Sequence, residues 1–324
     1  MSEQILKLGI PTGSLQKATI ELFAKAGFHI DDSERSYLPR IDDEQISLLM
    51  LRAQEMSRYV ANGVLDAGIT GHDWIEENKS DPRMPGACDV KDVCELAYSK
   101  ATSNPARWVL AVPNESDVTK PEDLAGGTVA TELANVTKKY FAKKNINVTV
   151  EFSWGATEVK ASLPPGVITG PERYERGSWT DDTIKERLVD AIVELTETGA
   201  SLRANNLRII DTVITSTTRL IANKKSWDDK FKRKKIENIS ILLNAAIEAR
   251  SKVGLKLNTK KDDLESILKI LPAEKSPTVS SLADSNYVAI EVIIDDKIER
   301  SLVPALKRAG ASGIITYPLN KVIH

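Results

Sequence analysis

Short apolar runs alternate with amphipathic stretches of helical period as far as about residue 250, and this alternation predicts α/β units. A strand over residues 5–10 leads through a turn at Pro11–Ser14 into a helix from Leu15, which Gly27 ends. A strand, a glycine turn and a helix then follow again before residue 80, although no internal sequence repeat is visible. Further strands are expected at Ile46–Leu51, Asp66–Thr70, Trp108–Val112, Thr128–Thr131, Asn147–Phe152, Leu188–Leu195, Arg208–Thr215 and Arg219–Ala222.

The C-terminal part, residues 251–324, has a different pattern. Its runs predict strand, helix, strand, strand, helix and strand, which is the βαββαβ order of a ferredoxin-like domain. Within the first pattern, the stretch Pro164–Glu186 interrupts the regular alternation; it is rich in Pro and Gly and is expected to form a long surface loop. Tyr174 and Trp179 in this loop are expected to pack on their own domain, with docking on a neighbour as the alternative.

Composition narrows the class of protein. The chain is 41% apolar and 28% charged, which excludes collagen-like and low-complexity proteins. Its 44 basic and 46 acidic residues leave a net charge of -2, so no nucleic-acid or membrane partner is expected. The basic run Lys224–Lys235 is interleaved with acids and is interpreted as a solvated helix face. Without an apolar run of roughly 20 residues or a signal-like N-terminus, and with two cysteines, we expect a cytoplasmic protein.

The segment 190–202 carries the clearest chemical signal. An apolar strand leads to Glu194, and a hydroxyl-rich turn at Thr196–Ser201 precedes a helix. Backbone N–H groups of such a turn, with the positive end of the helix, can bind a phosphate, and Gly199 permits close approach. The acids before the turn suit neutral sugar hydroxyls or a metal ion. Together these features describe a phosphoribosyl site, although an ordinary capped strand-to-helix turn explains the same residues.

At this segment the sequence resembles a known family. Val189–Leu207, VDAIVELTETGASLRANNL, is similar to the phosphoribosyl-pyrophosphate loop of the ATP phosphoribosyltransferases, the first enzymes of histidine biosynthesis. Four more segments resemble the family in the same order along the chain. They are LKLGIPTGSLQKATIELFAKAGF near the start, GVLDAGITGHDWI at 63–75, TVATELANVTKKYFA at 128–142 and SPTVSSLAD at 276–284. With the C-terminal domain present, the resemblance is to the long, self-sufficient form.

The resemblance implies an α/β fold with two domains around a cleft, similar to type II periplasmic binding proteins, followed by a ferredoxin-like regulatory domain. The implied limits are 1–102 with 217–250, 103–216, and 251–324. The implied reaction transfers phosphoribose from phosphoribosyl pyrophosphate to N1 of ATP, with Mg²⁺ as cofactor. Histidine is the implied feedback inhibitor, and dimers or hexamers are the implied assemblies.

The resemblance also implies three sets of site residues. Phosphoribosyl pyrophosphate is expected at Glu194, Thr196, Glu197, Thr198, Gly199, Ala200 and Ser201. ATP and phosphates are expected at Thr12, Gly13, Ser14, Arg52, Gly71, Asp73, Glu132 and Asn135, and inhibitory histidine at Asn258, Ser276 and Thr278. No side-chain nucleophile is expected, because the adenine nitrogen attacks directly, and no metal ligands are assigned.

Simpler roles for some of these residues stay open. Arg52 can form a surface ion pair with Glu55 or Asp66, and Asp73 and Asn135 can cap helices. Ser276 and Thr278 can serve as caps of a turn and a strand.

Two departures from the family pattern matter. The first glycine turn often reads Pro-Lys-Gly in the family, whereas this chain has Pro11-Thr12-Gly13, so one positive charge near the phosphates is missing. Either another base such as Arg52 replaces it or the activity is lower, and the alternative function is a catalytically silent nucleotide-binding or regulatory paralogue. The loop Pro164–Glu186 is also longer than the family pattern suggests. It is expected to be a neutral insertion, with cleft gating or an oligomer contact as alternatives.

Overall fold

The computed structural model describes residues 4–32, 36–81, 88–98, 105–162, 188–272 and 276–323. The loop expected at Pro164–Glu186, with Tyr174 and Trp179, lies outside the described residues. The chain divides into two compact units, one of residues 1–19 with 31–237 and one of residues 20–30 with 238–324. Helices α1 (Gln16–Ala26) and α8 (Lys230–Glu248) contribute residues to both units.

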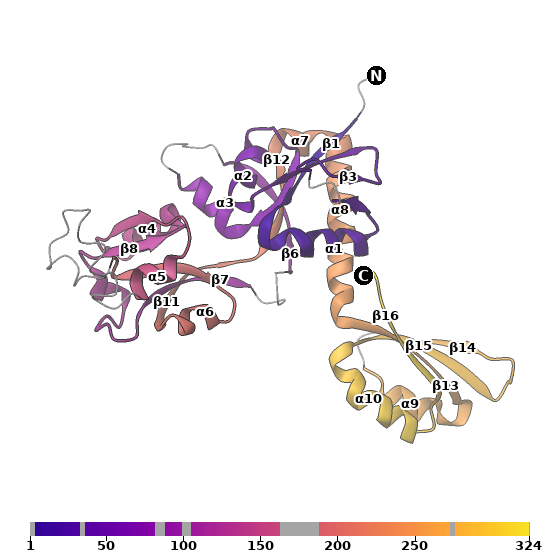
Figure 1. Cartoon of the computed structure of the whole chain (residues 1–324). Coiled ribbons are helices and arrows are strands. Elements are labelled where there is room, and N and C mark those ends of the chain that lie inside the picture. Colours follow the sequence, from indigo (N-terminus) through magenta and orange to yellow (C-terminus); the bar gives the residue numbers. More distant parts are fainter. Residues whose placement is uncertain are drawn as a thin grey trace. The chain divides into compact units, whose positions relative to one another are not determined.

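The first unit contains two five-stranded sheets, and the first of them forms lobe 1 (Figure 1). Its strands in spatial order are β4 (Ile46–Leu51), β1 (Leu6–Pro11), β5 (Ala67–Gly71), β12 (Thr218–Asn223) and β6 (Val90–Leu96). β1 is parallel to β4 and β5, whereas β12 is antiparallel to β5 and β6. Helix α2 (Ala53–Ala61) packs closely on this sheet, because a Cβ at Gly9 would lie 2.3 Å from Met56 Sδ.

Helix α3 (His72–Lys79) follows β5 directly. A short two-stranded ribbon is formed by β2 (Ile30–Asp31) and β3 (Arg40–Ile41).

The second sheet forms lobe 2 and repeats the topology of the first. Its strands in spatial order are β11 (Leu207–Ser216), β7 (Ala106–Pro113), β10 (Ala191–Thr196), β8 (Thr128–Thr131) and β9 (Thr149–Phe152). β7 is antiparallel to both of its neighbours, while β8 is parallel to β9 and β10. β7, which is antiparallel to both of its neighbours, therefore has the same position in lobe 2 as β12 has in lobe 1. Successive residues of β7 point to opposite faces of the sheet, and Trp108 and Val109 belong to two separate buried clusters. The sheet is therefore covered on both faces.

Helices α4 (Ala134–Lys143), α5 (Thr157–Ser162) and α6 (Ala200–Ala204) belong to lobe 2. The chain enters lobe 2 between β6 and β7 and returns between β11 and β12. Two sheets of this order, linked by two crossings, form the fold expected from the sequence, an α/β core of the type II periplasmic-binding-protein kind.

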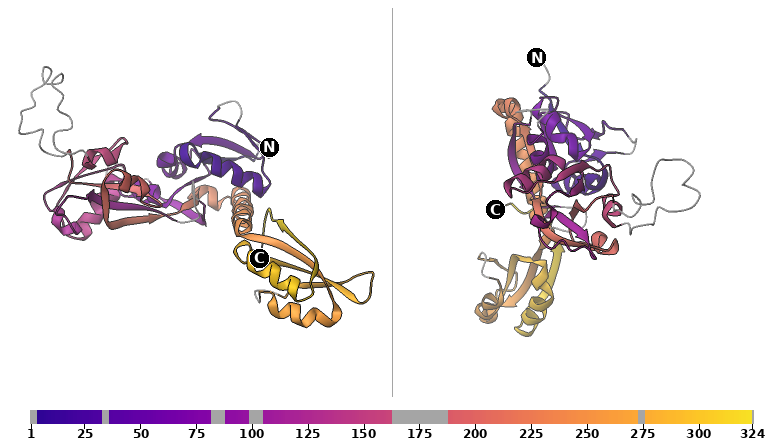
Figure 2. Two further views of the ribbon diagram at one scale, coloured as in Figure 1. Left: turned by 60° about the horizontal axis from the view of Figure 1, so that its bottom comes forward. Right: turned by 90° about the vertical axis from the view of Figure 1, so that its left-hand side faces the viewer.

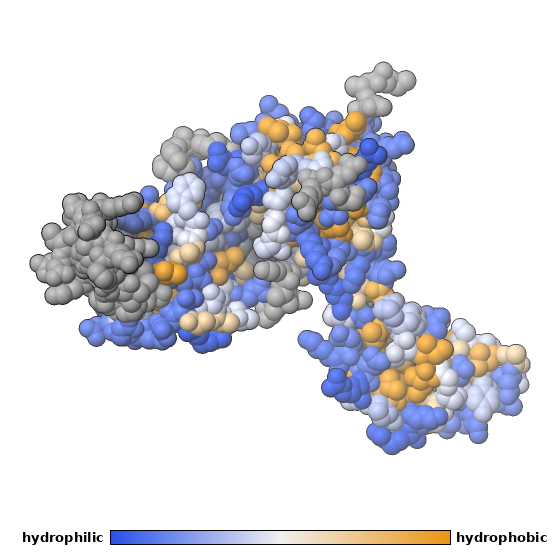
Figure 3. Space-filling model, viewed as in Figure 1, coloured by the Kyte–Doolittle hydropathy of each residue, from blue (hydrophilic) through white to orange (hydrophobic). Residues whose placement is uncertain are grey.

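The second unit contains the expected βαββαβ domain (Figure 2). Its sheet has the order β14 (Thr278–Ser281), β15 (Tyr287–Asp295), β13 (Lys252–Lys260) and β16 (Ser312–Pro318), with neighbours antiparallel. Helices α9 (Leu264–Ile270) and α10 (Asp296–Arg308) lie side by side on one face, and both share the buried cluster with β13 and β15. The surface of this unit carries a patch of apolar residues (Figure 3), and Ile293 and Ile315 are about half exposed.

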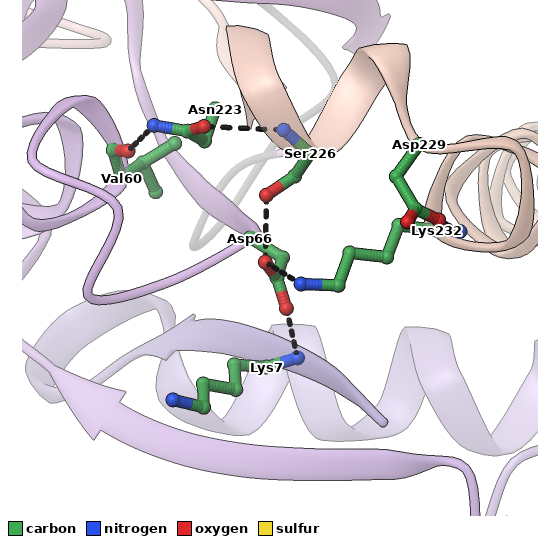
Figure 4. A network of polar contacts seen from close by, with 7 residues as sticks. All are labelled: Lys7, Val60, Asp66, Asn223, Ser226, Asp229 and Lys232. Atoms are coloured by element: carbon green, nitrogen blue, oxygen red, sulfur yellow. Dashed lines mark hydrogen bonds and ion pairs between the residues drawn. The ribbon is translucent and has the colours of Figure 1, made fainter. Parts of the chain in front are cut away.

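A buried polar network ties the beginning of β5 to neighbouring elements (Figure 4). Asp66 accepts hydrogen bonds from the backbone N–H of Lys7 at 2.8 Å and from Ser226 Oγ at 2.6 Å. Lys232 Nζ lies 2.7 Å from the same carboxylate. Burial opposes ionisation of Asp66, but these donors together hold its pKa below the ordinary value.

The expected single helix from about Asp228 is preceded by a separate short helix, α7 (Lys224–Asp228). Several basic side chains of the run Lys224–Lys235 contact acids or an aromatic ring. Lys235 pairs with Asp43 at 2.7 Å, Lys224 pairs with Asp89, and the Arg233 guanidinium lies over the Trp227 ring. These contacts favour the interpretation of the basic run as a solvated helix face.

Candidate functional site

The first unit contains an open cavity of about 1210 Å³, lined by residues of both lobes. Nine of the expected site residues line it: Thr12, Gly13, Ser14, Arg52, Gly71, Asp73, Glu132, Glu194 and Glu197. The other expected cleft residues are near neighbours of these in the chain and are not among the lining residues. They are Asn135, Thr196, Thr198, Gly199, Ala200 and Ser201. The structure therefore brings segments from five different strand ends, those of β1, β4, β5, β8 and β10, to one cavity.

The turn after β10 is folded by its own threonines. The N–H of Gly199 donates to Thr196 Oγ1 at 2.7 Å, and Thr196 is buried. Gly199 has φ = 72°, in the left-handed region that favours glycine, and it directly precedes α6. The N–H of Ala200 makes a longer contact of 3.4 Å with Thr198 Oγ1. The sequence implied a turn with free donors, whereas in this structure the Gly199 donor has an internal partner.

A positive charge lies against this turn. Arg203 Nη1 donates to the carbonyl oxygen of Thr198 at 3.0 Å, and a Cβ at Gly199 would lie 2.9 Å from the same nitrogen. Ser201 Oγ donates to Glu158 Oε1 at 2.6 Å. Sequence reasoning did not single out Arg203 or Glu158. The position of Arg203 four residues after Gly199 on the following helix is the signal that points to it.

Glu194, at the cavity end of β10, has a strongly perturbed pKa. Burial raises the pKa of its carboxyl to about 7, and the neighbouring acids Glu158 and Glu132 add to this effect. Hydrogen bonds from the Leu195 N–H and the Thr157 hydroxyl act in the opposite direction. Burial outweighs these hydrogen bonds, so the carboxylate is suited to bind hydroxyl donors or a cation supplied by a ligand.

Charges from the two lobes meet in the cavity. Burial raises the pKa of Glu132, and the positive charge of Arg52 partly opposes this. Arg52 precedes α2 at the end of β4, and the N–H of Thr12 donates to the Leu51 carbonyl at 2.8 Å. The glycine turn after β1 and Arg52 therefore lie side by side at the carboxyl ends of two parallel strands, where α/β sheets bind ligands. Asp66, which the sequence offered as an alternative ion-pair partner for Arg52, forms its ion pair with Lys232.

Asp73 has partners that the sequence did not suggest. It is 3% exposed, and its Oδ2 accepts a hydrogen bond from Trp108 Nε1 at 2.6 Å. Its Oδ1 accepts from Ser216 Oγ at 2.8 Å. Gly71, rather than Asp73, is the N-cap of α3, so helix capping does not explain this carboxylate.

Asn135 likewise is not the cap of its helix, because Leu133 occupies the N-cap position of α4. The N–H of Asn135 donates to Glu77 Oε1 at 2.9 Å. Its contribution to a nucleotide site stays a prediction.

The expected histidine-site residues lie in the second unit. Thr278 pairs with Glu291 and Asn258 pairs with Ala289, both on β15. This register places Thr278 and Asn258 on the same face of the sheet, and Ser276 lies two residues before Thr278.

Within the described part of the chain, no group of three or more His, Cys, Asp or Glu side chains is arranged to hold a metal ion. None of the helices in the described ranges is long and apolar enough to cross a membrane.

The fold and the cavity define a two-lobed α/β protein with a cavity between strand ends contributed by both lobes, lined by acidic and basic side chains. Comparison with known proteins makes this class specific. The family model of ATP phosphoribosyltransferase (HisG) matches residues 52–165 and 180–245, and the model of the HisG C-terminal domain matches residues 249–321. The chain belongs to the ATP phosphoribosyltransferase family.

Individual relatives agree. ATP phosphoribosyltransferase from Chlorobaculum parvum is 51% identical over 99% of both chains. The enzyme of that name from Geotalea daltonii is 50% identical over 98% of this chain and 99% of its own length. Among solved structures, the ATP phosphoribosyl transferase (HisG:HisZ) complex from Thermotoga maritima has a TM-score of 0.56 at 25% identity. This structural match covers 74% of this chain and 99% of the chain from Thermotoga maritima.

Proposed function

We propose that this chain transfers the phosphoribosyl group of phosphoribosyl pyrophosphate to N1 of the adenine of ATP and releases pyrophosphate. The observation that carries the proposal is that Glu194, at the entrance of the hydroxyl-rich turn, lines the same cavity as Arg52 and the Thr12 turn. One lobe thus offers groups suited to a phosphorylated sugar, and the other offers groups suited to phosphates. Family membership supports the same reaction.

In the proposed reaction, the lone pair of N1 forms a bond to the anomeric carbon while the bond from that carbon to pyrophosphate breaks. The electron pair leaves with pyrophosphate, and positive charge develops on the ribose ring as in glycoside cleavage. Glu194 accepts hydrogen bonds from the ribose hydroxyls, and Thr198–Ser201 surround the 5′-phosphate. Arg52 and the turn Thr12–Ser14 bind phosphates from lobe 1. The rate then arises from orientation of the two substrates and from electrostatic stabilisation.

Two positive charges can substitute for the lysine that Thr12 replaces. Arg52 lines the cavity, and Arg203 contacts the turn after β10. These two residues favour the enzyme over a silent binding paralogue.

The residues of the cavity fit Mg²⁺ as a cofactor. Glu132 and Glu194 both line the cavity, and the charge of Glu132 contributes to the raised pKa of Glu194. Mg²⁺ commonly binds through one or two carboxylates and the phosphates of its substrate. Glu194 and Glu132 are therefore the side chains that we propose would hold it, and the ion would there neutralise charge on the departing pyrophosphate.

The second unit is proposed to sense histidine through Asn258, Ser276 and Thr278, and the chain is proposed to assemble as dimers or hexamers. The three separate main sheets support the three-domain division implied by the sequence, with limits at 1–102 with 217–250, 103–216 and 251–324.

The decisive experiment supplies the purified full chain with ATP, phosphoribosyl pyrophosphate and Mg²⁺. The proposal predicts equal amounts of pyrophosphate and an N1-substituted nucleotide. Reactions that lack one substrate are the control. Binding of both substrates without either product would identify the silent paralogue instead.

A further inference from the structure

Helix α3 belongs to lobe 1 by sequence, yet it is hydrogen-bonded to both lobes. Asp73 and Glu77 are four residues apart and therefore lie on one face of the helix. Asp73 binds Trp108 Nε1 and Ser216 Oγ, as described above. Glu77 reaches the first turn of α4 in lobe 2. Its two carboxylate oxygens accept from the N–H groups of Asn135 and Val136, each at 2.9 Å.

The next residue along α3 faces the other way. Asn78 Nδ2 donates to the carbonyl oxygen of Gln54 at 2.9 Å and to Ser57 Oγ at 2.8 Å, both in lobe 1 around α2. Glu77 and Asn78 are each 9% exposed. Adjacent, equally buried residues thus bond α3 to different lobes, Asn78 within lobe 1 and Glu77 across to lobe 2.

The bond from Glu77 to α4 is suited to fixing geometry. A carboxylate at a helix N-terminus interacts favourably with the helix dipole, and hydrogen bonds to an ionised acceptor are stronger than neutral ones. Both N–H groups belong to the first turn of a helix, where no intrahelical carbonyl can satisfy them. Loss of Glu77 leaves two N–H groups without this acceptor at a buried contact between the lobes.

This contact is directly connected to the cavity. Glu132 lines the cavity and lies three residues before Asn135, in the segment that leads into α4. Arg52, on the lobe 1 side, interacts electrostatically with Glu132. Glu77 itself is not among the residues that line the cavity. It can therefore influence the alignment of Arg52 with Glu132 without touching a ligand.

We propose that Glu77 is a positioning residue for phosphoribosyl transfer, which sets the orientation of Glu132 and the turn after β10 relative to Arg52 by holding the N-terminus of α4. This inference rests on the proposed function, because it concerns the alignment of the two substrates of that reaction. A misplacement of about 1 Å between reacting groups can reduce the rate by about a hundredfold. Loss of the Glu77 carboxylate should accordingly lower kcat and leave the affinity of a single lobe for its own substrate nearly unchanged.

The test compares Glu77→Ala and Glu77→Gln with the wild-type chain. For Glu77→Ala we expect kcat to fall about tenfold to a hundredfold. The dissociation constant of phosphoribosyl pyrophosphate with Mg²⁺, measured by calorimetry without ATP, should stay within about threefold, because its turn in lobe 2 is intact. Glu77→Gln keeps one acceptor oxygen, so its kcat should be intermediate, and it decides the test if the alanine variant does not fold. Hydrogen exchange at the amides of Asn135 and Val136 should accelerate in the same order.

Asn78→Ala is the matched control, since it removes hydrogen bonds of the same helix within lobe 1. It should lower the melting temperature but leave kcat of the folded protein within about twofold of the wild type. Wild-type kcat in both Glu77 variants, or an equal loss of kcat in Asn78→Ala, overturns the inference. A wild-type chain that forms no product overturns the proposed function itself, so the two failures are distinguishable.

Discussion

The raised pKa of Glu194 leads to a quantitative prediction about stability. Replacing Glu194 by Gln keeps the size of the side chain and removes its ability to ionise. In the folded wild-type protein this carboxyl titrates at about 7, compared with an ordinary value of 4.5. The folded state therefore binds the proton more tightly than the unfolded state does. As the pH rises from 4.5 to about 7, the unfolded chain loses this proton more readily than the folded protein does. The free energy of unfolding of the wild type therefore falls as the pH rises through this range.

The size of the stability difference follows from the size of the pKa shift of Glu194. At about 1.36 kcal/mol for each pKa unit, the difference between 4.5 and about 7 corresponds to roughly 3 kcal/mol at pH 8. At pH 5 the folded carboxyl is protonated and the cost is below about 1 kcal/mol. Because Glu194 keeps some solvent exposure, these are upper values. Glu194→Gln should thus be more stable than the wild type at pH 8, by up to about 3 kcal/mol, and should lose most of this advantage at pH 5.

The assay is thermal or urea unfolding of both proteins without ligands at pH 5 and pH 8. For a unit of this size, 3 kcal/mol corresponds to about 6–12 °C in melting temperature. Glu151→Gln, which changes an exposed glutamate of the same lobe, is the control and should stay within about 0.5 kcal/mol of the wild type at both pH values. In the transferase assay, Glu194→Gln should raise KM for phosphoribosyl pyrophosphate or lower kcat.

The reasoning is refuted if Glu194→Gln is no more stable than the wild type at pH 8, or if its advantage is the same at pH 5. A more stable variant with wild-type kinetics would remove Glu194 from the substrate site and leave the electrostatic argument standing. A gain in stability accompanied by a loss of activity is the pattern expected of a ligand-binding acid.

Four further predictions concern other parts of the chain. Gly199→Ala forces a left-handed alanine, so it should cost about 1–2 kcal/mol of stability and raise KM for phosphoribosyl pyrophosphate; unchanged kinetics would exclude the turn from the site. Asp66→Asn should cost about 2–3 kcal/mol at neutral pH in urea unfolding. Because the pKa of Asp66 is lowered by folding, this difference should vanish as the pH falls through that pKa. Asp43→Asn should have a smaller effect, because the carboxylate of Asp43 is more exposed than that of Asp66. Thr278→Ala should weaken inhibition by histidine, Ser281→Ala on the opposite face of the same strand serves as its control, and equal inhibition in both would reject the assignment. Chelation of Mg²⁺ should abolish turnover and added Mg²⁺ should restore it; turnover that persists in chelator would contradict the cofactor assignment.

The central strands were predictable because burial on both faces requires nearly continuous apolar runs. Ile46–Leu51 and Thr128–Thr131 were expected at the limits the structure has, and the βαββαβ order of the second unit was also expected. β6 was not predicted. It lies at the edge of its sheet, most of its side chains are at least partly exposed, and its sequence VKDVCEL therefore lacks a strand-like pattern.

A helix after Gly71 was expected, and α3 is that helix, but the residues on its buried face were not predicted. Its buried side chains include Asp73, Glu77 and Asn78, which are polar, so hydrophobic periodicity does not mark its inner face. The partners of these residues are 35, 58 and 21 positions away along the chain, at Trp108, Asn135 and Ser57. Contacts of this kind depend on the packing of the lobes, which local patterns do not contain. The ligand-facing turns were recognisable because their glycines and hydroxyls are adjacent in sequence.

The matching strand order of the two lobes bears on how a site for two substrates can arise. β1 and β8 hold corresponding places in their sheets, as do β5 and β10. The chain segments at the ends of these four strands bring Thr12, Glu132, Gly71 and Glu197 to the cavity. Donor and acceptor can therefore each be held by equivalent strand ends of two lobes with one architecture. Differences confined to these loops are then sufficient to give the two lobes different substrates.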